Sequence, residues 1–114
     1  MILTKEFKFD AAHKLAWHEG KCKNLHGHTY KLQVFVSGKV NENGIIIDFY
    51  ELKKIVSEKV LEKLDHSNLN DIIDNPTAEN IVIWIWEQLR DSLNLSELKL
   101  WETDTSFVSY TGSD

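Results

Sequence analysis

The chain has 114 residues, 42% of them hydrophobic, which favours one globular domain spanning residues 1–114. Its net charge of −5 argues against a nucleic-acid partner held by a general positive field. No apolar run is long enough to span a membrane and the first residues do not resemble a secretion signal, so we expect a cytoplasmic protein with no membrane partner.

Two strands are predicted in the first third of the chain. Residues 3–13 alternate between apolar and polar side chains, which is typical of a half-buried strand, and His13 lies on the apolar face. Residues 28–36 alternate in the same way, with His28 at the start of the apolar face. A polar turn is expected to follow at residues 38–44.

Two helices are predicted next. Asp48 is a favourable N-cap residue, and apolar side chains then recur at helical spacing. This stripe consists of Phe49, Leu52, Ile55, Val56, Leu61 and Leu64. Residues 65–71 are rich in turn formers and are expected to form a loop. Thr77 is expected to cap the second helix, whose apolar residues exceed what one buried face requires and so indicate deep burial or a subunit contact.

Two short strands are predicted to close the chain, at about residues 97–103 and 106–110, with Asp104-Thr105 as the turn between them. The element order is therefore β-β-α-α-β-β. This order predicts an α+β fold, in which two helices cover one face of a four-stranded antiparallel sheet.

Two histidines two residues apart, His26 and His28, are the strongest sign of a functional site. In an extended backbone, side chains two residues apart share a face, so both imidazoles can reach one metal ion. His13 is the natural third ligand, because it ends a strand that is expected to pair with the strand beginning at His28. Three nitrogen ligands and one open position are typical of a catalytic zinc site.

Two other interpretations of the histidines are open from the residues alone. Some of them could be ordinary core or surface side chains, although a pair with a third partner makes this less favourable. Alternatively, Cys22 could supply a fourth ligand and close the site, giving a structural or copper-binding centre. The remaining histidine, His18, lies in a polar loop and is expected at the surface.

Cys22 is the only cysteine, so it cannot form an intrachain disulfide. The positive charges of Lys21 and Lys23 would stabilise a thiolate, which could act as a general base or as a nucleophile. The alternative is a small buried hydrophobic side chain, which the flanking lysines make less favourable. Together with Lys14, these lysines could bind an anionic substrate or could simply be solvated surface.

Asp65 and His66 place a carboxylate next to an imidazole. They could form a catalytic pair in a turn, or His66 could simply interact with the end of the preceding helix. Glu102 shares a strand face with Leu98 and Leu100, so it needs a partner if it is buried, and a heterocycle with paired N–H donors would supply one. At the sheet rim it would instead face water, which is the commoner outcome for glutamate.

Six motifs follow one another over nearly the whole chain. They are Phe9-Asp10-Ala11-Ala12-His13, Cys22-x-x-x-His26-Gly27-His28, Gly44-Ile45-Ile46-Ile47-Asp48-Phe49, Leu64-Asp65-His66-x-x-Leu69-Asn70, Asn75-Pro76-Thr77-Ala78-Glu79-Asn80 and Trp101-Glu102-Thr103. Together, and in this order, they resemble the motifs of the 6-pyruvoyl-tetrahydropterin synthase / 6-carboxy-tetrahydropterin synthase family. The resemblance implies three zinc ligands, which are His13, His26 and His28.

The resemblance also implies roles for the other candidate residues. Cys22 is similar to the family's catalytic base, assisted by Asp65 and His66 of a neighbouring subunit. Glu102 is similar to the residue that anchors the pterin ring, with Thr77 beside it. The implied assembly is a homo-hexamer, in which sheets of this tunnelling-fold type join at their open edges into trimeric barrels that pair.

Three residues separate Cys22 from His26, and this short spacing resembles the 6-carboxy-tetrahydropterin synthases of 7-deazaguanine, or queuosine-type, pathways. That resemblance implies a zinc-dependent lyase converting 7,8-dihydroneopterin triphosphate to 6-carboxy-5,6,7,8-tetrahydropterin, acetaldehyde and triphosphate, with Lys14, Lys21 and Lys23 as candidate phosphate contacts. The alternatives are 6-pyruvoyl-tetrahydropterin formation without carbon–carbon cleavage and a non-catalytic pterin- or metal-binding module.

Overall fold

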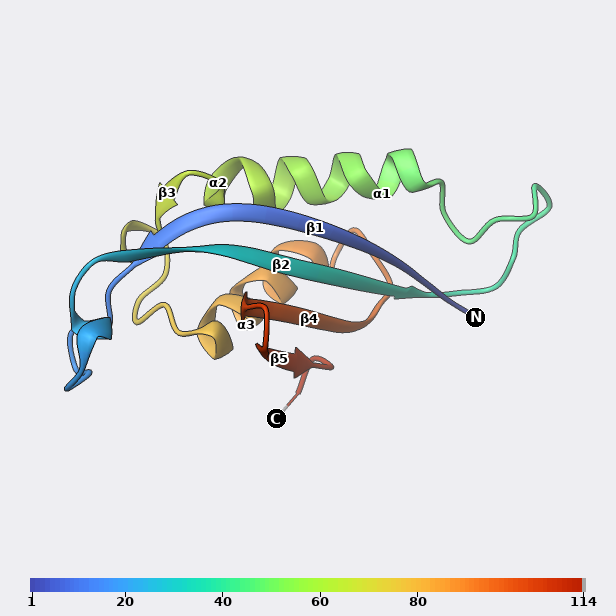
Figure 1. The fold of residues 1–114 in the computed structure, drawn as a ribbon. Coiled ribbons are helices and arrows are strands. Elements are labelled where there is room, and N and C mark those ends of the chain that lie inside the picture. The colour runs from blue at the N-terminus through green and yellow to red at the C-terminus, as the bar shows by residue number, and fades with distance from the viewer. Residues whose placement is uncertain (114) are drawn as a thin grey trace.

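A computed structural model describes residues 1–113, which form one sheet with helices against one of its faces (Figure 1). The strands are β1 (Ile2–His13), β2 (His26–Ser37), β3 (Ser67–Asn68), β4 (Leu95–Thr103) and β5 (Ser106–Tyr110). The α-helices are α1 (Phe49–Val56), α2 (Glu62–Leu64) and α3 (Ala78–Leu89). The short helical turns are η1 (Lys21–Lys23), η2 (Ser57–Leu61) and η3 (Leu69–Asp71), and η2 is a π-helical turn that joins α1 to α2. No helix among these residues has both the length and the apolarity needed to cross a membrane.

The sheet has five strands in the order β3-β1-β2-β4-β5. The four strands β1, β2, β4 and β5 pair with one another in antiparallel fashion and confirm the strands expected from the sequence. In contrast, β3 pairs in parallel with β1, with Ala11 opposite Ser67. The prediction of a four-stranded, purely antiparallel sheet is therefore wrong. Since β3 is two residues long and lies in the turn-rich segment 65–71, it carries no alternation that could reveal it.

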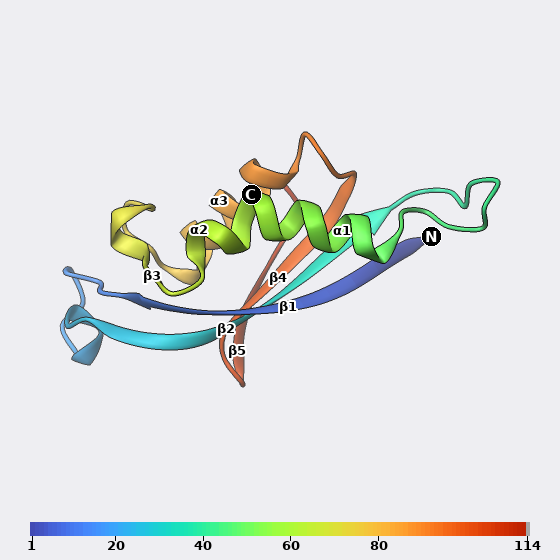
Figure 2. The same ribbon diagram turned by 90° about the horizontal axis from the view of Figure 1, so that it is seen from above.

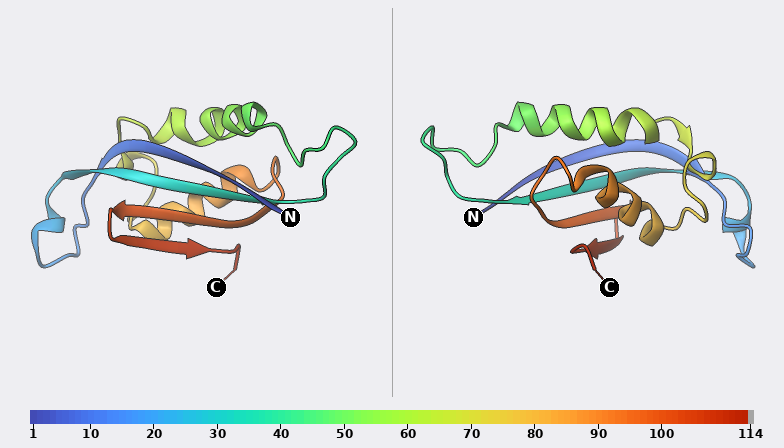
Figure 3. Two further views of the ribbon diagram at one scale, coloured as in Figure 1. Left: turned by 45° about the vertical axis from the view of Figure 1, so that its right-hand side comes forward. Right: turned by 180° about the vertical axis from the view of Figure 1, so that it is seen from behind.

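The helices lie on one face of the sheet, as expected. Figure 2 shows α1 and α3 on the same side of the strands, and Figure 3 shows α3 in front of them when the molecule is seen from behind. The strand side chains that face the helices form the core, including Phe9, Tyr30, Leu32 and Leu100, which are at most 2% exposed. Burial of each such large side chain contributes roughly 1.5–3 kcal/mol to stability.

Both long helical segments begin at the predicted caps. Asp48 Oδ1 accepts a hydrogen bond of 2.7 Å from the backbone N–H of Tyr50, and Thr77 Oγ1 accepts one of 3.1 Å from that of Asn80. Each cap satisfies a donor that the first turn of a helix cannot satisfy internally. The start of each helix is therefore specified locally.

The buried face of the first helical segment differs from the predicted stripe. Leu52, Val56 and Leu64 of the predicted stripe are fully buried, and so is Val60 of η2, which the stripe did not include, while Leu61 is only half-buried. Phe49 is 56% exposed, because it lies in the first turn and lines an open apolar pocket rather than the core. A strict 3.6-residue period cannot anticipate the π-helical turn.

The apolar surplus of α3 has a partial explanation in the sheet. The helix buries four residues, which are Ile81, Val82, Ile85 and Leu89. Trp86 extends the contact by packing edge-on against Tyr110 of β5, with ring centroids 5.4 Å apart. Ile83 is 37% exposed and belongs to neither contact.

Replacing Asp48 with alanine removes the cap of α1 and leaves the N–H of Tyr50 without its acceptor. We expect the free energy of unfolding to fall by about 1 kcal/mol in urea denaturation at neutral pH. Asp48→Asn is the matched control, because asparagine caps helices as well as aspartate does. An alanine variant as stable as the parent would contradict this role of Asp48.

Candidate active site

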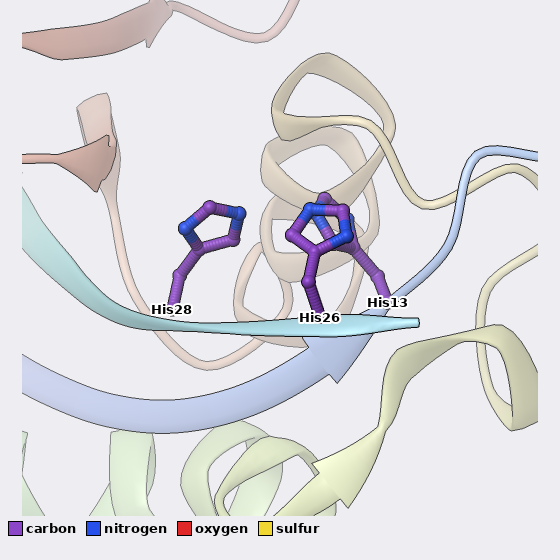
Figure 4. Close-up of side chains that lie close together, drawn as sticks. All are labelled: His13, His26 and His28. Carbon is purple, nitrogen blue, oxygen red and sulfur yellow. The ribbon is translucent and has the colours of Figure 1, made fainter. Parts of the chain in front are cut away.

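Three histidine side chains meet at the end of the β1–β2 pair. The register places His13 directly opposite His26 and Ala11 opposite His28, so the three imidazoles rise from the same face, as Figure 4 shows. Their ring centroids are 4.6 Å apart for His13–His26, 5.1 Å for His13–His28 and 4.9 Å for His26–His28. One nitrogen from each ring lies within 4.8 Å of the others, so a single ion can reach all three.

Hydrogen bonds to backbone carbonyls determine which ring nitrogen of His13 and of His26 is available to bind a metal ion. His13 Nδ1 lies 2.7 Å from the carbonyl oxygen of Pro76, and His26 Nδ1 lies 2.7 Å from that of Asn24. A carbonyl can only accept, so each Nδ1 carries the proton and donates. The neutral ring then presents an unprotonated Nε2, which is the arrangement typical of a metal ligand.

The free nitrogens are otherwise unsatisfied. Nε2 of His13 and Nε2 of His28 are buried and have no hydrogen-bond partner among the described residues. A buried acceptor without a donor is costly, and a bound cation would remove that cost. Three convergent imidazoles match the ligand set of a catalytic zinc ion, which keeps its fourth position for water or substrate. The residues therefore fit zinc.

Glu102 lies against this centre. Its Oε1 is 3.5 Å from His13 Nε2 and 3.8 Å from His28 Nε2. It stands at the irregularity between Trp101 and Thr103 in the β4–β5 pairing, where a bulge can re-aim a side chain. Sequence reasoning gave it a strand face but missed its contact with the histidines, which required knowing that β4 pairs with β2.

Two pKa shifts reflect the low polarity of the site. Burial lowers the pKa of His28 below its ordinary value, Glu102 opposes that shift, and His13 and His26 add to it. The neutral imidazole so favoured is the metal-binding form. Burial also raises the pKa of the Tyr30 hydroxyl, with Glu102 contributing in the same direction, so Tyr30 stays protonated at neutral pH.

Asp65 and His66 form a separate group with Asp10. Asp65 Oδ2 lies 3.1 Å from His66 Nδ1, and Asp65 Oδ1 accepts a hydrogen bond of 2.9 Å from the backbone N–H of Asp10. This backbone donor holds the pKa of the Asp65 carboxyl below its ordinary value, partly opposed by desolvation and helped by His66. His66 has a positive φ of 61°, a turn conformation that allows the contact between adjacent side chains. Both side chains are exposed, and within one chain they share no ligand group with the three histidines.

Cys22 lies in η1, on the loop between β1 and β2, and is half-buried. Within residues 1–113 its sulfur joins neither of the two groups of candidate ligands. The geometry thus favours an open site over one closed by sulfur. The same loop carries three exposed lysines, which are Lys14, Lys21 and Lys23.

Comparisons with known proteins agree over the whole fold. The family model described as 6-pyruvoyl tetrahydropterin synthase matches residues 2–113. The 6-carboxy-5,6,7,8-tetrahydropterin synthase of Haemophilus influenzae is 39% identical, covering 95% of this chain and 96% of the relative. The dihydroneopterin monophosphate aldolase of Pyrococcus furiosus is 48% identical, with 82% of each chain covered. The solved structure of Caenorhabditis elegans 6-pyruvoyl tetrahydropterin synthase has a TM-score of 0.88 at 30% identity, covering 99% of this chain and 96% of that one.

Adding Zn²⁺ to metal-free protein is expected to raise Tm, because an ion that binds only the folded state stabilises it by about 2.7 kcal/mol at 100 times its Kd. His28→Ala should remove most of this stabilisation in thermal unfolding. His18→Ala is the control, because His18 Nδ1 accepts a hydrogen bond of 2.8 Å from the backbone N–H of Gly20 and, among the described residues, the ring belongs to no candidate ligand group. Equal zinc responses of the two variants would count against the three-histidine site.

Proposed function

The chain belongs to the 6-pyruvoyl tetrahydropterin synthase family, and from that premise we propose that it is a zinc-dependent lyase of 7-deazaguanine (queuosine-type) biosynthesis. It is an enzyme of the tetrahydropterin synthase type. The proposed reaction converts 7,8-dihydroneopterin triphosphate and water to 6-carboxy-5,6,7,8-tetrahydropterin, acetaldehyde and triphosphate. Its support is the 6-carboxy-tetrahydropterin synthase among the relatives and the short interval from Cys22 to His26.

The observation that carries the proposal is the convergence of one ring nitrogen each from His13, His26 and His28, together with the buried Nε2 atoms of His13 and His28 that have no hydrogen-bond partner among the described residues. These residues would hold the zinc ion through neutral imidazoles. When bound, zinc supplies Lewis acidity that polarises the side-chain oxygens of the substrate and acidifies the adjacent C–H and O–H groups. His13 is 0% exposed, so its buried ring would shield one side of the zinc position from water.

Proton movement is assigned to the thiolate of Cys22. It would take a proton from the substrate side chain, and Asp65 and His66 would relay protons during the reaction. The family resemblance implies that Asp65 and His66 act in the site of a neighbouring copy in a homo-hexamer built from two trimers. Their exposure and their place outside the histidine ligand group of the same chain support this role. The electrons that reduce the pterin ring come from its own side chain, so no external redox cofactor is required.

Substrate binding is assigned to residues around the centre. Because Glu102 Oε1 lies 3.5 Å from His13 Nε2, a pterin held by Glu102 would be placed directly beside the histidines. Thr77 caps α3 one residue after Pro76, whose carbonyl binds His13, and is proposed as a second pterin contact. The exposed lysines of the Cys22 loop would pair with the triphosphate, as their charge allows.

Two related activities are the alternatives. Likeness to a dihydroneopterin monophosphate aldolase favours a carbon–carbon cleavage of the monophosphate as the second candidate. Likeness to 6-pyruvoyl tetrahydropterin synthase favours loss of triphosphate without carbon–carbon cleavage. Both would use the same pterin chemistry, so the products decide among them.

Product analysis by mass spectrometry tests the reaction. Zinc-loaded protein given 7,8-dihydroneopterin triphosphate should release acetaldehyde and triphosphate in equal amounts with 6-carboxy-tetrahydropterin. Triphosphate without acetaldehyde would replace the proposal by 6-pyruvoyl-tetrahydropterin formation. Turnover of the monophosphate alone, with a phosphorylated two-carbon aldehyde as product, would replace it by the aldolase activity.

The role of Cys22 is tested by Cys22→Ala. A general base contributes about 10²–10⁴ to the rate, so kcat should fall by about that factor while bound zinc stays at the parent level in metal analysis. Cys22→Ser, which keeps a hydroxyl in place of the thiol, serves as the conservative comparison. Loss of zinc from the alanine variant would identify the sulfur as a ligand and overturn the assignment.

A further inference from the structure

The loop that carries Cys22 is held by two hydrogen bonds from its backbone to the side-chain amide of Asn70, a residue far away in the sequence. Asn70 Oδ1 accepts a hydrogen bond of 2.8 Å from the backbone N–H of Lys14, and Asn70 Nδ2 donates one of 3.0 Å to the carbonyl of Lys14. The amide has one acceptor end and one donor end, so only one orientation satisfies both bonds. Asn70 thereby holds a single backbone residue at two points, as a paired strand would.

The hydrogen bonds between Asn70 and Lys14 are connected to Cys22 through one residue, Leu15. Lys14 is followed by Leu15, whose side chain is 9% exposed and whose backbone N–H donates a hydrogen bond of 2.8 Å to the carbonyl of Cys22. This bond closes the part of the loop from Leu15 to Cys22, and it begins one residue beyond the residue that Asn70 holds. Displacement of Lys14 would be transmitted to Cys22 through that bond.

A second amide holds the same loop. Asn75 Oδ1 accepts a hydrogen bond of 2.6 Å from the indole N–H of Trp17. Asn75 is itself fixed at the start of α3, since its carbonyl accepts from the backbone N–H of Thr77 at 2.8 Å and from Asn80 Nδ2 at 2.9 Å. The loop therefore has two attachments to residues 69–77.

The segment 69–77 also holds a candidate metal ligand. The carbonyl of Pro76 accepts the hydrogen bond from His13 Nδ1 at 2.7 Å. The segment is anchored in the core by Leu69 and Ile73, which are 0% and 6% exposed. The segment 69–77 therefore makes hydrogen bonds both to His13 of the histidine centre and to the loop that carries Cys22. It fixes the position of the loop relative to the histidines.

We propose that Asn70 is a positioning residue for Cys22, acting through Lys14 and Leu15 to hold the thiol at a defined place relative to the three histidines. The inference rests on the proposed role of Cys22 as the base. Proton transfer demands a well-defined geometry, and a displacement of about 1 Å can cost about 100-fold in rate. Asn70 need not touch the substrate to control the reaction.

Steady-state kinetics of Asn70→Ala is the first measurement. We expect kcat to fall by about 10- to 100-fold with KM within twofold of the parent and the zinc content unchanged. Asn94→Ala is the matched control: Asn94 Nδ2 donates to the Ser37 carbonyl at 3.1 Å, at the opposite end of β2, and its loss should leave kcat at the parent value. Should Asn70→Ala not fold, Asn70→Asp carries the same comparison, because it keeps the acceptor for the Lys14 N–H and loses only the donor.

Two readouts separate positioning from a merely structural role. Alkylation of Cys22 by iodoacetamide, followed by intact-protein mass spectrometry, should become several-fold faster in Asn70→Ala and stay unchanged in Asn94→Ala. In a Cys22→Ala background, Asn70→Ala should cause no further loss of the residual turnover, because both changes act on one function.

Parent-level kcat in the Asn70 variants, an unchanged alkylation rate, or losses that add in the double variant would each overturn the proposal. Failure of the proposed function has a different signature, since the parent would then lack turnover or Cys22→Ala would retain it. The alkylation comparison still reports in that case whether Asn70 holds the Cys22 loop.

Discussion

The antiparallel register of β1 and β2 is the constraint on which the site depends. It sets His13 opposite His26 and leaves His28 two residues further along the same face. A slip of one residue would turn every side chain of a strand to the opposite face. Burial of Phe9 and Tyr30, which are 2% and 0% exposed and stack with centroids 5.0 Å apart, opposes such a slip. The hydrophobic core thereby fixes the positions of the three histidines.

Hydrogen bonds to backbone carbonyls stabilise the histidine centre, whereas buried ring nitrogens without a hydrogen-bond partner among the described residues destabilise it. Carbonyls of Pro76 and Asn24 orient two imidazoles, yet the Nε2 atoms of His13 and His28 are buried without a partner within residues 1–113. Such a centre costs folding energy, and a bound cation would remove that cost, so we expect metal binding to raise the stability of the protein. A cost of this kind at one end of an otherwise satisfied sheet is expected of a functional site.

The parts of this structure that follow from local patterns could be predicted from the sequence. Strand alternation and the caps at Asp48 and Thr77 each depend on a few adjacent residues, and the structure confirms them. The convergence of the three histidines followed from parity and from the expected pairing of two neighbouring strands. The placement of Glu102 against them could not be derived in that way, because it depends on the pairing of β2 with β4 across more than sixty residues and on a local bulge.

Other features leave no side-chain signal at all. The carbonyl of Pro76 is a backbone group, and its contact with His13 arises only when the start of α3 packs beside β1. The π-helical turn η2 has no side-chain pattern of its own, and β3 is too short to show a period. Asn70 is part of a motif in the sequence, but its hydrogen bonds to the backbone of Lys14 are a tertiary contact that the motif does not reveal.

X-ray absorption at the zinc edge of the purified, zinc-loaded protein shows which atoms bind the ion. We expect a first shell of imidazole nitrogen at about 2.0–2.1 Å completed by oxygen, with no sulfur. A zinc–sulfur distance of about 2.3 Å would show that Cys22 closes the site. Such a shell, or a protein that takes up no zinc, would contradict an open centre of three histidines served by a free thiol.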